Sequence, residues 1–503
     1  MKTELQNIPE LLNARIEAAP DKVFLFSQAD GRQFTYREFG EAVKRTASLL
    51  SGKGIKKGDV VSLLIPNSVE YVIAYFACWQ LGALAGPVNS LLKAEEVTYV
   101  VSNSDTKALL VNSEFLPIVT EVREQLPALK HVIRFDDVQE ATRDVDGPLR
   151  ETNITTDDEA IIIYTSGTTG KPKGCLLTHG NVIANARQIS QWLGFGVEDR
   201  LLTIMPLFHM NAVSVTTMAG LYAGGSSVVS PKFSASRFWQ IISDYQITSF
   251  GSVATMLSML LSTYPDGVPP GLRTAQLRFA MCGSAPVPAE TIKRFEETFD
   301  CLVIEGYGLS ESTCRSTFNP PDTRRRAGSC GLPIGNEMRV VDENDNEVEV
   351  GTLGEIVLRG ENILKGYYKN PDATTIAFRN GWFHTGDIGY RDADGFYFIV
   401  DRKSDMIIRG GENIYPREID EVLYQHPAVA AAAVVGVPDD LYGEEVAGFV
   451  VLREGREASE AELIAFCKQH LADYKCPKTV RLVKDIPKGP TGKLLKRELA
   501  KMV

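Results

Sequence analysis

The sequence predicts an α/β protein with a large N-terminal α/β body of several subdomains and a small, mobile α+β domain at the C-terminal end. Three observations predict this fold. Helical and strand patterns alternate over residues 1–150, the alternation returns over Thr203–Val253, and residues 401–503 carry a strand–helix pattern of their own. Strands that alternate with helices favour parallel βαβ units.

Composition bounds the class of protein before any motif is considered. With 503 residues, 44% apolar and 23% charged, the chain has room for about three domains, or for one large body and a satellite. The net charge of −11 argues against nucleic-acid binding. We expect no transmembrane helix and no signal peptide, because neither a long apolar run nor an apolar N-terminal segment is present. The eight cysteines form no C-x-x-C pair, which is typical of a cytoplasmic protein with reduced thiols.

The N-terminal elements are predicted from their end signals. Tyr36–Lys53 has the pattern of an amphipathic helix, which Gly54 stops, and Val60–Ile65 has the pattern of a strand. Ser68 is a suitable N-cap for a helix that runs to Leu81 and ends at Gly82. Further short strands are expected at Leu84–Val88, Ala108–Val111 and His131–Phe135.

The C-terminal elements follow a hairpin over Gly389–Val400, whose turn is the sequence Asp-Ala-Asp-Gly. We place the domain boundary at Asp401, which gives an ATP- and acyl-binding domain over residues 1–400 and a mobile domain over residues 401–503. Within the second domain we expect helices at Arg417–Gln425 and Ala461–Leu471, and strands at Val429–Val437, Val446–Leu452 and Val480–Val483.

A loop rich in glycine, hydroxyl groups and lysine, Tyr164–Gly174, lies between the apolar strands Ala160–Ile163 and Cys175–Leu177. Backbone N–H groups, hydroxyls and ammonium groups of this kind bind polyphosphates. The loop is not a Walker A sequence, because its spacing is too short and Pro172 stands where Ser or Thr would bind Mg²⁺. The alternative interpretation is a flexible surface hairpin. The candidate ATP-binding residues are Thr165, Ser166, Gly167, Thr168, Thr169 and Lys173.

A second motif, Gly306–Ser312, brings an aromatic ring, a hydroxyl and a carboxylate together on a glycine-rich turn. Tyr307 is suited to stack on a base, Ser310 to contact phosphate, and Glu311 to hold Mg²⁺ directly or through water. A polar turn after the strand Leu302–Ile304 is the alternative. Two weaker segments are Gly283–Pro286, which follows an apolar strand, and Trp382–Asp387, which supplies a carboxylate after a glycine.

In their order and spacing these motifs resemble those of the AMP-forming acyl-CoA synthetase superfamily, and the resemblance covers about Asn67 to Lys493. That superfamily usually has Thr where this chain has Ser310, and the hydroxyl is retained. The resemblance implies that Glu311 binds Mg²⁺ and that Asp387 accepts the ribose hydroxyls with the help of Arg402. It adds to the ATP-binding set Ser284, Ala285, Pro286, Tyr307, Gly308 and Ser310.

The resemblance also implies roles in acyl transfer. Asp401 becomes the hinge of the small domain, Gly410 and Gly411 line the CoA tunnel, and Lys493 bridges the substrate carboxylate and the α-phosphate during adenylation. His209 matches a position that gates the acyl site, although a buried, hydrogen-bonded histidine is the competing interpretation. The expected acyl pocket comprises Met210, Asn211, Val213, Phe250, Ser252, Gly283 and Gly308.

The expected function is an ATP-dependent carboxylate:CoA ligase that uses Mg²⁺, forms an acyl-adenylate and releases AMP and pyrophosphate. The acid is expected to be short- to medium-chain, or similar to carnitine or crotonobetaine. Nine basic residues from Lys475 onward, opposed locally by Asp485 and Glu498, favour contact with the phosphates of CoA, unless they form a solvated face. Two alternatives are a ligase that passes the acyl group to a carrier protein or amine, and a non-catalytic nucleotide-binding regulator.

Overall fold

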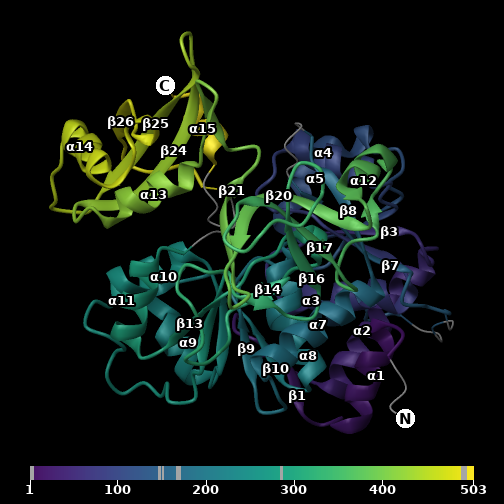
Figure 1. Ribbon diagram of the computed structural model, residues 1–503. Coiled ribbons are helices and arrows are strands. Elements are labelled where there is room, and N and C mark those ends of the chain that lie inside the picture. The colour runs from purple at the N-terminus through teal and green to yellow at the C-terminus, as the bar shows by residue number, and fades with distance from the viewer. Residues whose placement is uncertain are drawn as a thin grey trace.

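The computed structural model of the chain describes residues 5–145, 149, 152–165, 171–283, 287–488 and 495–502. Figure 1 shows two parts: a large body of helices and strands, and a smaller lobe formed by the last elements of the chain. Strand β21 (Tyr397–Arg402) ends where the smaller lobe begins. The fold class predicted from the sequence, α/β with a large body and a smaller C-terminal part, is confirmed.

Two sheets organise the body. In the described residues, sheet 1 has the strand order β13-β12-β11-β9-β10-β1-β2, and all of its pairs are parallel except β1–β2. Sheet 2 has the order β18-β8-β7-β4-β3-β5-β6, parallel from β7 to β6. The strands of sheet 1 are β1 (Val23–Ser27), β2 (Gln33–Thr35), β9 (Arg200–Thr203), β10 (Ser226–Val229), β11 (Ser249–Ser252), β12 (Phe279–Cys282) and β13 (Leu302–Glu305). Those of sheet 2 are β3 (Val60–Leu64), β4 (Leu84–Pro87), β5 (Ala108–Val111), β6 (His131–Arg134), β7 (Glu159–Thr165), β8 (Lys173–Thr178) and β18 (Gly366–Tyr367).

Helices between the two sheets share one core with both of them. They are α1 (Ile8–Ala18), α2 (Tyr36–Gly52), α3 (Val69–Leu81), α7 (His179–Leu193) and α8 (Ala219–Ala223), together with a π-helix, η3 (Asn211–Met218). Helix α3 is apolar on all sides, which is typical of a helix surrounded by protein. Its ends match the sequence signals, since the Ser68 hydroxyl accepts from the Tyr71 N–H at 3.3 Å and Gly82 ends it with φ 69°.

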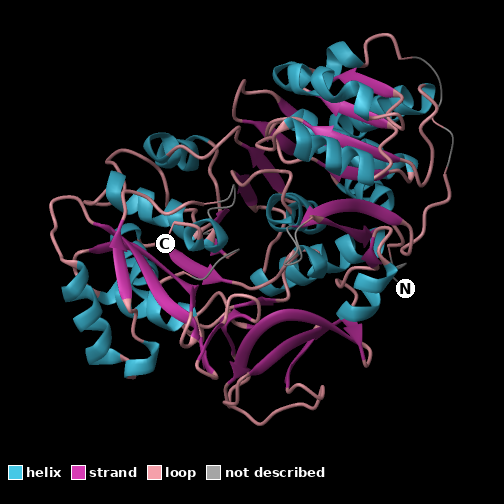
Figure 2. Ribbon diagram, turned by 90° about the horizontal axis from the view of Figure 1, so that it is seen from above, coloured by secondary structure: helices cyan, strands magenta, loops and turns pink. Residues whose placement is uncertain are grey.

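Other helices cover the outer faces of the two sheets. The outer face of sheet 1 packs against α9 (Phe238–Asp244), α10 (Ala254–Thr263) and α11 (Ala289–Phe299), and that of sheet 2 packs against α4 (Ala94–Asn103) and α5 (Leu116–Val122). The view from above shows helices lying against the strands rather than in a separate bundle (Figure 2). Such layering buries both faces of a parallel sheet and leaves its strand ends available for a site.

Besides the two-stranded pair of β14 (Thr317–Phe318) and β15 (Leu332–Pro333), two smaller sheets complete the described fold: one antiparallel, and one antiparallel except for the parallel pair β25–β26. The first contains β16 (Glu337–Val341), β17 (Gly354–Arg359), β19 (Phe378–Arg379), β20 (Trp382–Arg391) and β21, with α12 (Pro371–Ala377) beside it. The second contains β22 (Ile407–Arg409), β23 (Glu412–Ile414), β24 (Val429–Asp439), β25 (Gly443–Leu452) and β26 (Thr479–Leu482). Helices α13 (Pro416–Gln425), α14 (Glu460–His470) and α15 (Lys496–Ala500) pack on the second sheet.

The core of the C-terminal sheet contains only residues from Ile407 onward, and Asp401 lies inside the last strand of the preceding antiparallel sheet. The domain boundary at Asp401 stays a prediction. The hairpin over Gly389–Val400 is predicted from the sequence, but strands β16, β17 and β19 of the same sheet are not. In the described part of the chain, no helix is both long and apolar enough to cross a membrane.

Candidate active site

The candidate site lies at the carboxyl ends of strands in sheet 1. The segments after β9, β11, β12 and β13 begin at residues 204, 253, 283 and 306, and all of these strands run parallel in one sheet. Ligands in open α/β sheets bind in the crevice outside the carboxyl ends of the strands. Two of the segments predicted from the sequence, those that begin at Gly283 and Gly306, therefore lie on neighbouring strands.

Tyr307, Asp387 and Arg402 form a connected chain of polar contacts. The Tyr307 hydroxyl donates to Asp387 Oδ2 at 2.5 Å, and Arg402 Nε lies 3.1 Å from Asp387 Oδ1. Strands β20 and β21 pair Asp387 with Arg402 in register, so the sheet itself sets this ion pair. The Asp387 carboxylate raises the pKa of Arg402, while burial and the same carboxylate raise that of Tyr307. At neutral pH Tyr307 is therefore a neutral donor and Arg402 a cation.

Glu311 lies near the ends of the two strands that carry the glycine-rich loop. Its Oε1 accepts from the Tyr367 hydroxyl at 3.2 Å and lies 3.5 Å from the Thr165 hydroxyl. Thr165 and Lys173 are register partners on β7 and β8, and Lys173 Nζ lies 5.2 Å from the centre of the Tyr367 ring. The Glu311 carboxylate and the Thr165 hydroxyl thus lie near the Lys173 ammonium group, where β7 ends and β8 begins.

This oxygen-rich arrangement fits a magnesium ion that comes with a nucleotide. Mg²⁺ is commonly held by one or two carboxylates, by water and by substrate phosphates, rather than by a full cage of side chains. Among the residues that the structure describes, no three His, Cys, Asp or Glu side chains gather as a metal-binding group. Glu311 and Thr165 match the first kind of site and not the second.

Several predicted residues lie outside the described residues: Ser166, Gly167, Thr168, Thr169, Ser284, Ala285, Pro286 and Lys493. Ser310 begins a single helical turn, η5 (Ser310–Ser312), and Glu311 is on the same turn. Gly308 packs so closely on the backbone of Cys314 that a Cβ there would overlap its carbonyl oxygen. Only glycine fits at position 308, whatever its role toward a ligand.

Asp401 connects the body with the C-terminal lobe. One carboxylate oxygen accepts from the Arg417 N–H at the start of α13, at 3.0 Å, and lies 4.0 Å from Lys496 Nζ on α15. Lys496 also lies 3.3 Å from Asp420. Burial raises the pKa of Asp420 to about 6, and the neighbouring lysine opposes that shift. A strand of the body and two helices of the lobe thus meet at one small ionic cluster.

Gly410 and Gly411 form the exposed turn between β22 and β23. Their φ angles are 59° and 91°, in the region that favours glycine, and the Gly410 N–H donates to the Tyr442 carbonyl at 2.8 Å. The turn belongs to the sheet of the lobe, whereas Tyr307, Glu311 and Asp387 belong to the body. For these glycines a role at the site stays a prediction.

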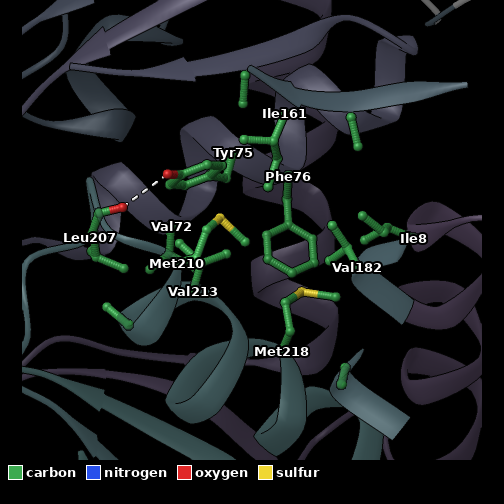
Figure 3. Packing of buried hydrophobic residues seen from close by; sticks show 14 of the residues in the cluster. Ile8, Val72, Tyr75, Phe76, Ile161, Val182, Leu207, Met210, Val213 and Met218 are labelled. Atoms are coloured by element: carbon green, nitrogen blue, oxygen red, sulfur yellow. Dashed lines mark hydrogen bonds between the residues drawn. The ribbon is translucent and has the colours of Figure 1, made fainter. Parts of the chain in front are cut away.

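The predicted acyl-pocket residues separate into groups. Met210 and Val213 pack in the main core beside Val72, Tyr75 and Phe76, as Figure 3 shows. Phe250 and Ser252 have the opposite orientation on β11 from Gly251, and Phe250 packs against Phe238 in the core of the outer face, with ring centres 4.8 Å apart. This places Phe250 on the other side of sheet 1 from the main core.

Asn211 and His209 keep polar atoms with no described partner. Asn211 is 6% exposed, and neither its Oδ1 nor its Nδ2 has a hydrogen-bond partner among the described residues. The same holds for the buried Nε2 atom of His209, and burial lowers the pKa of this ring to about 4. The imidazole is therefore neutral at pH 7. The competing interpretation, a buried and hydrogen-bonded histidine, is not supported at Nε2, which has no hydrogen-bond partner among the described residues.

Sequence reasoning missed Arg315, Tyr367 and Lys496. Arg315 is 2% exposed and lies next to Gly283 and Gly306. In the sequence, Arg315 stands out only as a charged residue among small and polar ones just after the Gly306–Ser312 motif. Tyr367 and Lys496 carry no local signal, because their partners Glu311 and Asp401 are distant in the chain.

Three lysines of the basic C-terminal segment are paired with acids from elsewhere in the chain. Lys475 binds Glu418 at 2.7 Å, and Lys478 binds Asp439 at 2.9 Å. These pairs join residues 57 and 39 positions apart, so a count of local charges misses them. The expectation of a strongly positive tail is thus weakened for these two lysines and for Lys496.

Comparison with known proteins places these features in a family. Residues 12–368 match the family described as AMP-binding enzyme, and residues 418–493 match the AMP-binding enzyme C-terminal domain. A sulfoacetate–CoA ligase of Cupriavidus necator is 37% identical over 97% of this chain and 96% of its own length. An oxalate–CoA ligase of Arabidopsis thaliana is 36% identical over 93% of each chain. The structure of o-succinylbenzoate CoA synthetase (MenE) from Bacillus subtilis, in complex with its acyl-adenylate intermediate, superposes with a TM-score of 0.88 at 31% identity over 98% of both chains.

Proposed function

We propose a mechanism for this site from the premise that the chain belongs to the AMP-binding enzyme family, in its acyl-CoA synthetase branch. The reaction is the ATP-dependent ligation of a carboxylic acid to CoA through an acyl-adenylate, with release of AMP and pyrophosphate. A carboxylate is a poor electrophile, and adenylation converts it into a mixed anhydride with a good leaving group. What remains to be assigned is which residues perform each part of this reaction.

The polar chain of Tyr307, Asp387 and Arg402 carries the assignment of the nucleotide site. In our proposal Asp387 accepts the ribose hydroxyls, because a carboxylate has two oxygens that accept several hydrogen bonds. Arg402 holds this carboxylate in place through the ion pair at 3.1 Å. The Tyr307 ring stacks on the base, at the carboxyl end of β13, where open α/β sheets bind nucleotides.

The triphosphate is assigned to the loop between β7 and β8. Thr165 and Lys173 stand at its two ends, so that a hydroxyl and a cation face the phosphates, with the intervening loop residues supplying N–H and hydroxyl donors. Glu311 would hold Mg²⁺, together with the Thr165 hydroxyl, and the ion would neutralise charge on the phosphates. The acid carboxylate attacks the α-phosphorus, and pyrophosphate leaves.

The second half-reaction requires a different orientation of the lobe. We assign Lys493 to adenylation, where its ammonium group stabilises charge that develops between the carboxylate and the α-phosphate. Gly410 and Gly411 are assigned to the passage for the CoA thiol. Asp401 is the pivot, because it contacts α13 directly and Lys496 of α15 electrostatically. The thiolate then attacks the acyl carbonyl carbon, and AMP leaves.

The acid is proposed to be short. Two relatives are named for sulfoacetate and oxalate, both of them small acids. The edge of sheet 1 agrees with this, because Asn211 and His209 bring buried polar atoms to the region where the acyl group is expected. A long hydrocarbon chain would leave those atoms without hydrogen bonds, which is costly in a buried site.

The test is a pyrophosphate-release assay across a panel of short carboxylic acids, with and without CoA. We expect acid-dependent pyrophosphate release and a thioester only when CoA is present. Glu311→Gln should lower the rate strongly, whereas Glu337→Gln, at a surface carboxylate paired with Arg359 at 2.6 Å, should not. Acid-dependent AMP release that CoA does not stimulate would assign the acyl group to a carrier protein or amine instead.

A further inference from the structure

Arg315 is a buried cation at the edge of sheet 1. It is 2% exposed, and none of the ion pairs among the described residues includes it. Its guanidinium donates from Nη1 to the Gly306 carbonyl at 2.9 Å and lies 5.3 Å from the centre of the Phe318 ring. Neither Nε nor Nη2 has a hydrogen-bond partner among the described residues. Buried charges are normally paired, because taking an ion out of water is costly.

The acids near Arg315 in the sequence have other described partners. Glu311 accepts from the Tyr367 hydroxyl at 3.2 Å. Glu305, on the strand that precedes Gly306, interacts with Arg417, which opposes the rise in pKa that burial causes. The open donors of the guanidinium are thus suited to an anion that does not belong to the protein.

Arg315 lies on the same face of sheet 1 as Asn211. Gly251 on β11 and Met281 on β12 are register partners, and Gly283 is two residues beyond Met281, so positions 251 and 283 point to one face. A Cβ at Gly251 would lie 3.2 Å from Asn211 Oδ1, and one at Gly283 would overlap the Arg315 guanidinium. Two glycines on neighbouring strands therefore make room for one amide and one cation.

We propose that Arg315 is the specificity-determining residue for the acid: it binds a second anionic group, carboxylate or sulfonate, at the end of the substrate that does not react. This inference rests on the proposed function and names the substrate class of the same site. A planar guanidinium with two open N–H positions pairs well with an oxyanion, and Asn211 adds a donor and an acceptor on the same face. The substrate would then be a short acid with two negative charges.

The experiment compares acids that differ only in the distal group: succinate against butyrate, and malonate against propionate, with sulfoacetate and oxalate as further probes. The wild type should prefer at least one dianion to its methyl-ended match. Arg315→Met should lower kcat/KM for that dianion by roughly 10²–10³-fold and change kcat/KM for the monoanion by only a few-fold. For the dianion, kcat/KM of Arg315→Lys should lie between those of the wild type and Arg315→Met, because lysine keeps the charge but not the planar fork.

A matched control is Arg200→Met. Arg200 also donates to one carbonyl, that of Tyr245 at 2.7 Å, and also lies over one phenylalanine ring, Phe26 at 4.5 Å, but at the amino end of β9. This variant should leave the preference between matched acids unchanged. Gly283→Ala is a second route to the same effect, because its methyl group would displace the guanidinium without removing the charge.

The outcomes separate the inference from the proposed function. Equal losses for both members of a pair in Arg315→Met would mean that Arg315 serves the nucleotide or the fold, and would overturn the inference. A wild-type preference for the methyl-ended acids would overturn it as well. If no acid yields AMP with CoA, the proposed function itself fails. Calorimetric titration of succinate or malonate into wild type and Arg315→Lys, with a non-hydrolysable ATP analogue present, supplies a readout that does not need turnover.

Discussion

Arg315 in the body is a buried cation and Lys496 at the start of α15 is a half-buried one, and their surroundings differ. Lys496 lies 3.3 Å from Asp420 and 4.0 Å from Asp401, and these carboxylates outweigh the effect of burial and raise its pKa. Arg315 has a carbonyl oxygen and an aromatic ring in place of the carboxylates. A cation that the protein neutralises itself has a positioning role. A cation left with open donors at a strand edge is available to a ligand.

The comparison extends to the two regions as wholes. The edge of sheet 1 brings groups from successive strands together within one rigid sheet. The lobe carries Gly410 and Gly411 on the turn between β22 and β23, and the Asp401 cluster joins the lobe to the body. We expect substitutions at the edge of sheet 1 to change which substrate reacts, and substitutions in the lobe to change which half-reaction proceeds.

The largest expected effect tests the assignment of the lobe to separate half-reactions. Lys493→Ala should slow adenylation by roughly 10²–10³-fold, which is typical for loss of one preorganised donor. Thioester formation from a supplied acyl-adenylate should stay nearly intact, because this model uses Lys493 only in the first step. Single-turnover assays of each half-reaction measure the two rates, and equal losses in both would contradict the two-orientation mechanism.

A substitution at the junction should have the opposite pattern. Asp401→Pro fixes φ near −65° at the proposed pivot and restricts Val400 before it, so that the lobe is held in one orientation. We expect adenylate to form and CoA transfer to fall on the order of 10²-fold. Burst-phase measurement of AMP and thioester separates the steps. Wild-type steady-state thioester synthesis in this variant would show that the pivot lies elsewhere.

Removal of Lys496 and removal of Arg315 should lower the free energy of unfolding by different amounts. Lys496→Met leaves Asp401 and Asp420 as neighbouring acids without their lysine, and we expect a loss of about 2–3 kcal/mol. Arg315→Met leaves no carboxylate unpaired among the described residues and removes one hydrogen bond, so the change should stay within about 1 kcal/mol. Denaturant unfolding of both variants checks the difference, and a larger loss for Arg315→Met would mean that its charge is structural.

A pH-dependent effect on stability is expected for Glu305, a buried carboxyl group of the body that interacts with Arg417 of the lobe. Burial raises its pKa to about 7, so the folded state holds a proton that the unfolded state loses near its ordinary pKa. Stability is therefore lost as pH rises through this window. Glu305→Gln cannot titrate, so it does not lose stability in this way. The free energy of unfolding of the variant minus that of the wild type should therefore rise by about 2 kcal/mol from pH 5 to pH 7. Urea unfolding at several pH values measures the trend, and a pH-independent difference would argue against a raised pKa.

The sequence was sufficient for most elements and for the family, because the signals that carry them are local. The ends of α2 and α3 follow from Gly54, Ser68 and Gly82, and strands such as β3, β4 and β5 appear as short apolar runs. The motifs around Thr165, Tyr307 and Asp387 are continuous stretches of chain, so their residue types and spacing are visible without a structure.

Only the tertiary structure decided which side chains share a face and which charges are paired. Met210 and Val213 pack in the main core, and Phe250 points to the other side of sheet 1, because side-chain direction depends on strand register and helix packing rather than on sequence proximity. The lysines of the C-terminal segment find acids such as Glu418 many residues away. Arg315 is the converse case. In the sequence it is one charged residue among many, and its importance comes from burial at a sheet edge where no described ion pair includes it, which only the folded chain establishes.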